Sequence, residues 1–536
     1  MNAPSHHPYS RAGICVWING LIVLFLAVYF LILPGFILVH DLMDPNLRQP
    51  GGIPRMAWRV HASLTPHYEH WARARVASGR AGHLQLNDVP STEWPMFGSV
   101  FYLAATENLQ RAWDKGEHGS RIAPKVYARA AIEAAAELIL DPIHHTWVRT
   151  HWGPNYLHHE NVFFRAMIIQ GLTCRQNLIG DGKYLDILRD QVETLADDLD
   201  RSPYGLLHDY PGECYPVDVL AAITMIRRAD PVLGTDHSAF AGRARRGFQG
   251  ARLDARGLPP YVAEPTTGGH DGISRGIGNS YICIYAPELY PDLARVWYDA
   301  YQRYFWQERI GAAGFREYPN DLPGYELFFD VDSGPVIFGF SPAGNAYGLA
   351  AARVNGRFDQ AWPLASQVLA ACWHLPNGSL LGPRMLSNAA HAPYLGEANM
   401  LFLLTQNPIP AQPIRLGGHM PPLVYVGFMF YFGLGTLVIG LTTRKLFAWK
   451  NTGEIVHVPF ARIQLSLWLL LMLAGIILMI CISPGIGMLP IITAQLLPRF
   501  GKVKRNSSRN GRMASVVAAV RQNGNPRFFP LGAGQT

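Results

Sequence analysis

The chain is short of charge and of cysteine. Only 16% of its 536 residues are Asp, Glu, Lys or Arg, while 49% are hydrophobic. This balance is unusual for a soluble domain and indicates a membrane protein that carries a globular part. Six cysteines are scattered without a CxxC pair, so neither a disulfide framework nor a zinc site is indicated. The sequence also lacks a serine nucleophile elbow, a P-loop and a dinucleotide-binding fingerprint.

Acidic residues are absent from the C-terminal segment 499–536, which contains eight Lys and Arg residues. Because the formal net charge of the whole chain is +7, the remainder has a charge of −1. The body is therefore not expected to bind nucleic acid. The tail is expected either to hold anionic lipid headgroups or to be a disordered, solvated end.

Three apolar runs are long enough to cross ~30 Å of hydrocarbon, namely 14–39, 423–442 and 463–483. The first is too long for a signal-peptide core and is interpreted as an anchor. Basic residues in the loop 443–462 favour a cytoplasmic loop and N-terminus, with 41–420 outside. The basic tail then requires the apolar segment 484–497 to be re-entrant or a fourth crossing.

Four regions follow from these runs: an N-terminal anchor (1–40), a large outer domain (41–420), C-terminal membrane helices (421–498) and the basic tail (499–536). We expect a multi-pass protein of a bacterial-type inner membrane, with the large domain on the periplasmic side. The lipid bilayer is thus an expected partner.

The outer domain is predicted to be mainly α. Helical patterns recur at 97–113, 125–140, 161–179, 184–199, 216–228, 281–289, 293–306, 344–354, 360–373 and 396–404. Alternating strand patterns are few, and 330–340 is the best of them. Ten helices with polar loops suit an (α/α)6 barrel, or toroid. An α-solenoid is the alternative, although no fixed sequence period supports it.

The stretch 202–218 is the strongest candidate for a catalytic loop. It contains His208, Asp209, Glu213 and Asp218 among prolines and glycines that prevent a long helix. Such a loop can deliver acids to the mouth of a helical scaffold. In the alternative interpretation, Asp218 only caps the helix that follows.

Two further acid clusters lie elsewhere in the chain. Glu93 either completes a capping box with Ser91 or is a cleft acid beside Trp94, with a pKa raised by burial. Asp330 and Asp332 lie two residues apart, so in an extended strand they would face the same way. Their like charges would raise the pKa of one of them.

A loop at 144–161 holds five histidines among tryptophan and tyrosine. Its spacing is not that of a metalloprotease motif, so no metal site and no cofactor are predicted. We expect this loop and its neighbours to line the substrate site, through Trp94, Trp152, His158, Tyr204, Asp209 and Tyr215. The Gly-rich segment 261–279 is interpreted as structural.

Short motifs along 90–405 occur in the order and nearly the spacing of one known family. They are Glu160-Asn161, Ile179-Gly180, Lys183-Tyr184, Gly205, Pro211, Gly234–Asp236, Asp330/Asp332-Ser333-Gly334, Gly348–Ala350 and Asn399–Leu403. In these features the outer domain resembles the linalool dehydratase/isomerase family, whose fold is an (α/α)6 barrel. The resemblance implies that fold and a site at the mouth of the barrel.

The departures from that family concern its chemistry. Two family cysteines correspond to His208 and Asp218, and the family's catalytic histidine falls on Met167. Thiol-based dehydration of a terpene alcohol is therefore not implied for this chain. The soluble family member also lacks the apolar spans.

Paired carboxylates with aromatic neighbours predict acid/base catalysis. We predict Asp218 as the base and Glu93 or Asp332 as the acid, with His208 and Asp330 in the same catalytic group. The reaction would be hydrolysis or elimination on an envelope glycan. Two alternatives stay open: a hydratase or dehydratase-isomerase acting on a hydrophobic, terpenoid-like alcohol, and a non-catalytic barrel that binds a ligand.

Overall fold

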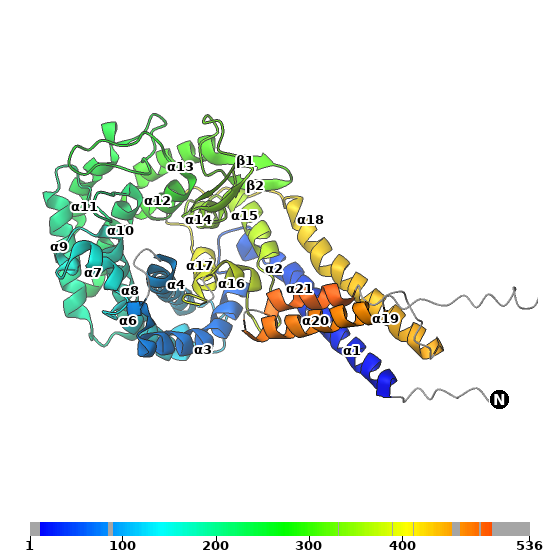
Figure 1. The fold of residues 1–536 in the computed structure, drawn as a ribbon. Coiled ribbons are helices and arrows are strands. Elements are labelled where there is room, and N and C mark those ends of the chain that lie inside the picture. Colours follow the sequence, from blue (N-terminus) through cyan, green and yellow to red (C-terminus); the bar gives the residue numbers. More distant parts are fainter. Residues whose placement is uncertain are drawn as a thin grey trace, which may run out of the picture.

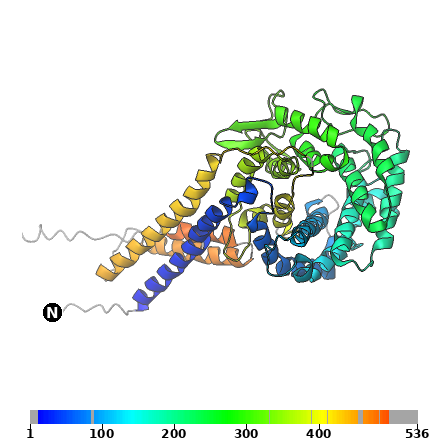
Figure 2. The same ribbon diagram turned by 180° about the vertical axis from the view of Figure 1, so that it is seen from behind.

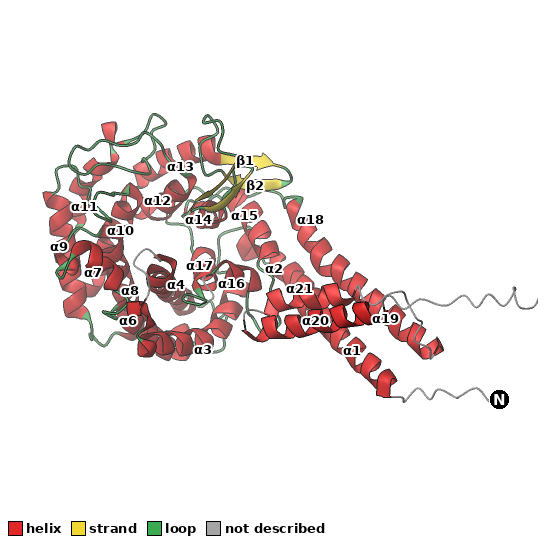
Figure 3. Cartoon of the chain, viewed as in Figure 1, coloured by secondary structure: helices red, strands yellow, loops and turns green. Residues whose placement is uncertain are grey.

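The computed structural model describes residues 11–83, 89–330, 332–387, 390–410, 412–452, 461–481 and 484–495. These residues form a mainly helical structure with two short antiparallel β-ribbons (Figure 3). The mainly α expectation is confirmed. The basic tail at 499–536 lies outside the described residues.

All ten predicted helical segments of the outer domain fall on helices. The longer helices are α3 (Arg55–Ser78), α4 (Val89–Asp114), α6 (Arg129–Ile139), α8 (Val162–Ile179), α9 (Leu185–Arg201), α10 (Pro216–Leu233), α12 (Gly276–Leu289), α13 (Pro291–Phe305), α14 (Pro342–Val354), α15 (Phe358–Ala371) and α17 (Leu395–Leu404). Shorter ones are α5 (Pro124–Tyr127), α7 (Thr146–Trp152), α11 (Ser238–Ala244) and α16 (Leu381–Leu386).

The sequence pattern missed α3 and the beginning of α4. In α3 the buried side chains Met56, Val60, Leu64 and Tyr68 recur every four residues, a helical signal that Pro66 and many charged neighbours obscure. In α4 the helix begins eight residues before the predicted start and contains Pro95. Pro95 lies beyond the first turn and cannot donate the helical hydrogen bond to residue 91, which is why the sequence pattern favoured a later start.

Six helices pack against one another in a closed ring (Figure 1). Following the chain, α4 packs on α8, α8 on α10, α10 on α12, α12 on α14, α14 on α17 and α17 on α4. A second set lies outside: α6 covers α4 and α8, α9 covers α8 and α10, α13 covers α12, and α15 covers α14. Helix α8 is buried around almost its whole circumference, whereas α9 buries one face, as expected for inner and outer helices.

The inner helices run in the same direction, as contacts between their C-terminal ends show. Near their C-terminal ends, Asn177 of α8 donates to Glu107 of α4 at 2.7 Å, and Asn108 of α4 donates to Thr405 after α17 at 3.2 Å. The N-terminal ends therefore share the opposite side of the ring. The candidate catalytic loops lie on that side.

Strand β1 (Trp306–Arg309) pairs with β2 (Ala312–Phe315), and β3 (Leu327–Asp330) pairs with β4 (Gly334–Ile337). The predicted strand at 330–340 is wrong in part, because the chain turns after Asp330. The Asp330 carboxylate accepts the backbone N–H groups of Asp332 at 2.9 Å and Ser333 at 3.0 Å, which fixes that turn.

Among the described residues, two helices are long and apolar enough to cross a membrane, Trp17–Leu42 and Leu423–Phe447. The first consists of α1 (Arg11–Ala27), a π-helical turn (Val28–Ile32) and α2 (Leu33–Leu42). The second consists of α18 (Leu423–Phe428), a π-helical turn (Met429–Leu434) and α19 (Gly435–Thr452). The two lie side by side and extend away from the ring (Figure 2).

The predicted span at 463–483 forms α20 (Ala461–Cys481), which packs against α21 (Pro484–Gln495). At 1.5 Å per residue, the 12 residues of α21 extend about 18 Å. This length is too short for a crossing of its own.

The first apolar helix is fixed to the ring by polar contacts. The buried Asp41 carboxylate accepts two hydrogen bonds from Arg59, at 3.0 and 2.6 Å. The indole of Trp373, after α15, donates to the carbonyl of Phe30 at 2.7 Å. A π-helical turn leaves a carbonyl without its usual helical partner, and Trp373 supplies one.

Candidate active site

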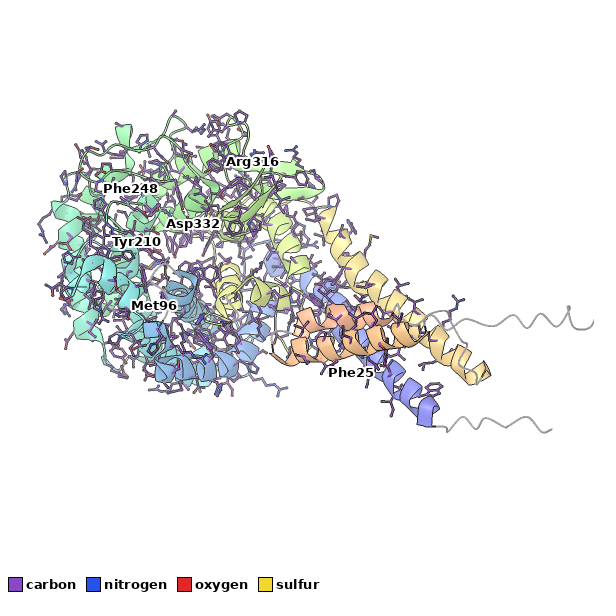
Figure 4. All side chains as sticks on the ribbon, viewed as in Figure 1. Phe25, Met96, Tyr210, Phe248, Arg316 and Asp332 are labelled. Carbon is purple, nitrogen blue, oxygen red and sulfur yellow. The ribbon has the colours of Figure 1, made fainter. Side chains whose placement is uncertain are left out.

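Acids from distant parts of the chain meet at the N-terminal ends of the inner helices. Glu93 belongs to α4, Asp209 and Tyr210 to the loop before α10, and Asp218 to the first turn of α10. Asp332 lies in the β3–β4 turn. Figure 4 shows Tyr210 and Asp332 over the middle of the ring.

Glu93 is a buried acid and not a capping residue. Helix α4 begins at Val89, so Glu93 lies inside it, and its carboxylate accepts the Tyr210 hydroxyl at 2.8 Å. Burial raises the pKa of Glu93 to about 7; the Tyr210 hydrogen bond opposes this rise and the charge of Asp332 adds to it. Near neutral pH, Glu93 can therefore either hold or accept a proton.

Asp209 supports the loop. Its two carboxylate oxygens accept the backbone N–H groups of Phe163, at the start of α8, and of Tyr215, both at 2.9 Å. Burial raises its pKa to about 8, although these two bonds favour the charged form. Both oxygens of Asp209, which was predicted to contact substrate, hold the loop against α8.

Asp218 stands in the first turn of α10 but does not cap it. The N-cap residue is Tyr215, and no side chain caps the helix. Within the described ranges, no side chain or backbone group hydrogen-bonds the half-buried Asp218 carboxylate. Burial raises its pKa well above the usual range, and the charges of Asp209, Glu93 and Asp332 raise it further.

Asp209 and Asp218 lie in the same region of low dielectric constant. A negative charge on one therefore disfavours a negative charge on the other. The two N–H donors stabilise the negative charge on Asp209. Since no such donor among the described residues reaches Asp218, burial and the neighbouring charges favour its uncharged form more strongly than that of Asp209.

Asp330 is an ion-pair partner and not half of an acid dyad. Arg275 contacts the carboxylates of Asp330 at 2.9 Å and Glu317 at 2.8 Å. Partial burial opposes ionisation of Asp330, yet the bond to Arg275 and two backbone N–H groups lower its pKa. The rise in pKa that was expected for one residue of this pair is therefore not found at Asp330, because Arg275 and the turn determine its pKa.

Glu317 lies beneath this pair and is fully buried. Burial raises its pKa to about 7, although Arg275 opposes the rise. Exposed Asp332 instead accepts a hydrogen bond from Tyr261. The Tyr261 ring lies 4.2 Å from the Arg275 guanidinium and 5.3 Å from the ring of Tyr215. The segment 261–279, interpreted as structural, thus places Tyr261 at the acid group.

Tyrosines on the inner helices were missed by the sequence interpretation. Tyr281 of α12 and Tyr347 of α14 make an edge-to-face contact with centroids 5.1 Å apart. Burial raises the pKa of each, and the charge of Asp218 contributes to both shifts. Candidates were sought in loops, whereas these two side chains lie within helices. Identifying them would have required knowing which face of each inner helix points to the middle of the ring.

Several predicted residues flank the acid group. His208 contacts Glu160 at 2.7 Å, and Trp152 donates to the Asp209 carbonyl at 3.3 Å. The Tyr215 hydroxyl donates to Glu213 at 2.9 Å. Trp94 is half-buried, next to Glu93 in α4.

Two predicted substrate contacts have other partners. Exposed His158 pairs with Asp190 of the outer helix α9 at 3.1 Å. The ring of Tyr204 lies under the guanidinium of Arg252 at 4.2 Å. No contact in the described structure joins either residue to the acid group.

Two of the five histidines in the loop 144–161 lie in the protein core. His144 bonds Asp141 at 2.7 Å, and His145 lies between the Tyr156 hydroxyl at 2.9 Å and the Ile139 carbonyl at 2.7 Å. Across the part of the chain that the structure describes, no group of three or more His, Cys, Asp or Glu side chains is arranged as a metal site.

No protein-family model matches the chain, and no curated protein matches it.

Proposed function

We propose that the outer domain is an (α/α)6-barrel enzyme that breaks a carbon–oxygen bond by acid/base catalysis. The closed ring of inner helices and its outer helices support the barrel. The resemblance to the linalool dehydratase/isomerase family supports it as well. The apolar helices would hold the barrel at a membrane, on its periplasmic side.

One observation carries the proposal: the Asp218 carboxyl has no internal hydrogen-bond partner among the described residues, and burial raises its pKa well above the usual range, while burial raises the pKa of nearby Glu93 to about 7. Asp218 would donate its proton to the leaving oxygen. Glu93 would take a proton from water in hydrolysis, or from a neighbouring carbon in elimination. These roles reverse the sequence-based assignment, because burial favours the uncharged form of Asp218.

We place an envelope glycan first among the substrates. The rings of Tyr210, Tyr281 and Tyr347 belong to the same region, and aromatic faces suit the C–H faces of sugars. Hydrolysis or elimination of a glycosidic link needs the proposed acid and base. Asp332, held by Tyr261, would keep the proton on Asp218 through its charge.

A second candidate is hydration or dehydration of a hydrophobic, terpenoid-like alcohol. The observation that favours it is the tyrosine lining around an uncharged acid, since aromatic faces stabilise a developing cation. The family resemblance points the same way, although His208 and Asp218 stand where the family has cysteines. Loss of those cysteines is also what a non-catalytic, ligand-binding barrel would show.

The test uses the full chain in nanodiscs, incubated with envelope glycans and with terpene alcohols. New reducing ends indicate hydrolysis, unsaturated sugars indicate elimination, and alkenes indicate dehydration. We expect Asp218→Asn and Glu93→Gln each to lower turnover on the order of 10²–10⁴-fold. The matched control is Asp197→Asn on the outer face of α9. Turnover that survives Asp218→Asn contradicts the proposal, and binding without turnover by the unaltered chain supports the ligand-binding alternative.

A further inference from the structure

The β3–β4 ribbon presents an apolar face to solvent. Leu327 lies opposite Ile337, and Phe329 lies opposite Pro335. Leu327 is 78% exposed and Phe329 is 77% exposed, while Val336 points into the protein. An exposed apolar strand face of this kind marks a contact surface.

Two turns beside this face have an apolar residue at a solvent-exposed position, Ile310 in one and Phe338 in the other. Ile310 and Gly311 connect β1 to β2 with φ of 55° and 74°, and Phe338 and Gly339 have φ of 53° and 81°. Asn, Asp or Gly is preferred at the first position of such turns, and a β-branched or bulky residue there is strained. Ile310 is nevertheless 60% exposed and Phe338 is 46% exposed. Neither residue gains enough burial within the protein to offset that strain.

The two turns lie next to each other. The Gln307 side chain donates to the Phe338 carbonyl at 2.9 Å, and the Arg309 guanidinium lies 5.9 Å from the Phe338 ring. Arg309 also pairs with Glu326, which precedes β3. The turn residues and the strand face therefore form one apolar surface: Ile310, Leu327, Phe329, Ile337 and Phe338, called here the hairpin surface.

The hairpin surface meets the chain where the second apolar helix begins. The backbone N–H of Leu423, the first residue of α18, donates to the Gly311 carbonyl at 2.8 Å. Pro422 lies so close to Gly311 that an added Cβ would be 3.2 Å from it. Ile310 thus stands beside the start of a helix that is long and apolar enough to span a membrane.

We infer that the hairpin surface enters the interfacial layer of the bilayer beside the start of α18. When Leu423–Phe447 crosses the membrane, the lipid surface lies beside Leu423 and can cover the hairpin surface. Apolar side chains at the boundary of headgroups and acyl chains gain the burial that the protein does not give them.

The contact would also place the acid group near the bilayer. The turn of the same ribbon carries Asp332, whose charge acts on Asp218 and Glu93. If the proposed function holds, on which this consequence rests, the substrate would be amphiphilic and would be taken from the outer leaflet.

The test places a fluorophore at the hairpin surface in the full chain, with Cys15 and Cys481 replaced by serine. The probe is attached to Phe338→Cys and, in a second variant, to Ile310→Cys. Nanodiscs contain phosphatidylcholine and phosphatidylglycerol with or without brominated acyl chains, which quench on contact. The matched control is Ala239→Cys on α11, across the ring from the apolar helices (Figure 1).

We expect brominated lipid to reduce emission at 338 and 310 at least twofold more than at 239. Equal quenching at all three positions overturns the inference. An emission change that depends on protein concentration and not on bromine also overturns it, because a second copy of the chain would then cover the surface. This readout needs no substrate, so it is independent of whether the barrel is an enzyme.

Discussion

The Tyr210 hydroxyl donates a 2.8 Å hydrogen bond to Glu93 across 117 residues of sequence. This contact joins the loop before α10 to α4, so that the acids of two inner helices share one region. It also sets the protonation of Glu93, because it opposes the rise in pKa that burial causes.

Removal of that hydroxyl should move the titration of Glu93. In Tyr210→Phe the carboxylate stays buried but loses a donor that stabilises its charge, so its pKa should rise above about 7. The free energy of unfolding should fall by about 1 kcal/mol. The infrared carboxyl band that disappears in Glu93→Gln reports this titration. In the control Tyr215→Phe, whose hydroxyl bonds Glu213, that titration should not move; an unchanged midpoint in Tyr210→Phe would show that the bond is not formed.

Burial of Glu93 should make the protein less stable as the pH rises. Its pKa is raised from 4.5 to about 7, so between these values the folded chain holds a proton that the unfolded chain has lost. The contribution of Glu93 to the free energy of unfolding is fully present below pH 4.5 and decreases between pH 4.5 and pH 7. Above pH 7 the free energy of unfolding is lower by roughly 3 kcal/mol than below pH 4.5. Glu93→Gln should reduce the loss of unfolding free energy between pH 5 and pH 8 by roughly 3 kcal/mol, while Asp209, Asp218 and Glu317, whose pKa values are also raised, still contribute.

Asp330 provides a control, because its pKa is shifted in the opposite direction to that of Glu93. Its pKa is lowered, so its contribution is present above the unfolded pKa and is lost as the pH falls through the folded value. Asp330→Asn should therefore leave the loss of stability between pH 5 and pH 8 in place. If Glu93→Gln leaves the same dependence, Glu93 is not buried as an acid.

Arg275 should be essential for the stability of the ribbon next to the site. It is the cation paired with both buried Glu317 and Asp330. Arg275→Gln leaves Glu317 buried without its partner and should lower the free energy of unfolding by about 3–5 kcal/mol. Chemical denaturation measures this change. Arg243→Gln, which breaks an exposed pair with Asp200, should lower it by less than about 1 kcal/mol; equal effects would contradict the buried pair.

The strained turn at Ile310 should become more stable when the residue suits its backbone. Asn tolerates positive φ, so Ile310→Asn should raise the free energy of unfolding in detergent by about 1 kcal/mol. Thermal unfolding checks this. Ile187→Asn, at an exposed position of α9 with ordinary helical backbone, should give no such gain. A loss at Ile310 would mean that its side chain contributes to the fold.

The sequence by itself determined most of the helices, although it missed α3 and the beginning of α4. Local features suffice for this, because apolar spacing, glycine and proline act within a few residues. The proline- and glycine-rich stretch 202–215 had to be a loop, and the runs around 17–42 and 423–447 had to be apolar helices. The three acid clusters were also visible locally, since Glu93, Asp218 and Asp332 lie in or beside loops.

Only the tertiary structure decided what each acid does. Asp330 and Asp332 were expected to raise the pKa of one of the pair, yet the pKa of Asp330 is lowered by Arg275, 55 residues earlier in the chain, and by the turn. Asp209 is buried and Asp218 is half-buried, but the backbone donors of Phe163 and Tyr215 reach only Asp209 of the two. A pKa depends on burial and on charges brought close by folding, and these are properties of the ring of helices and not of the local sequence.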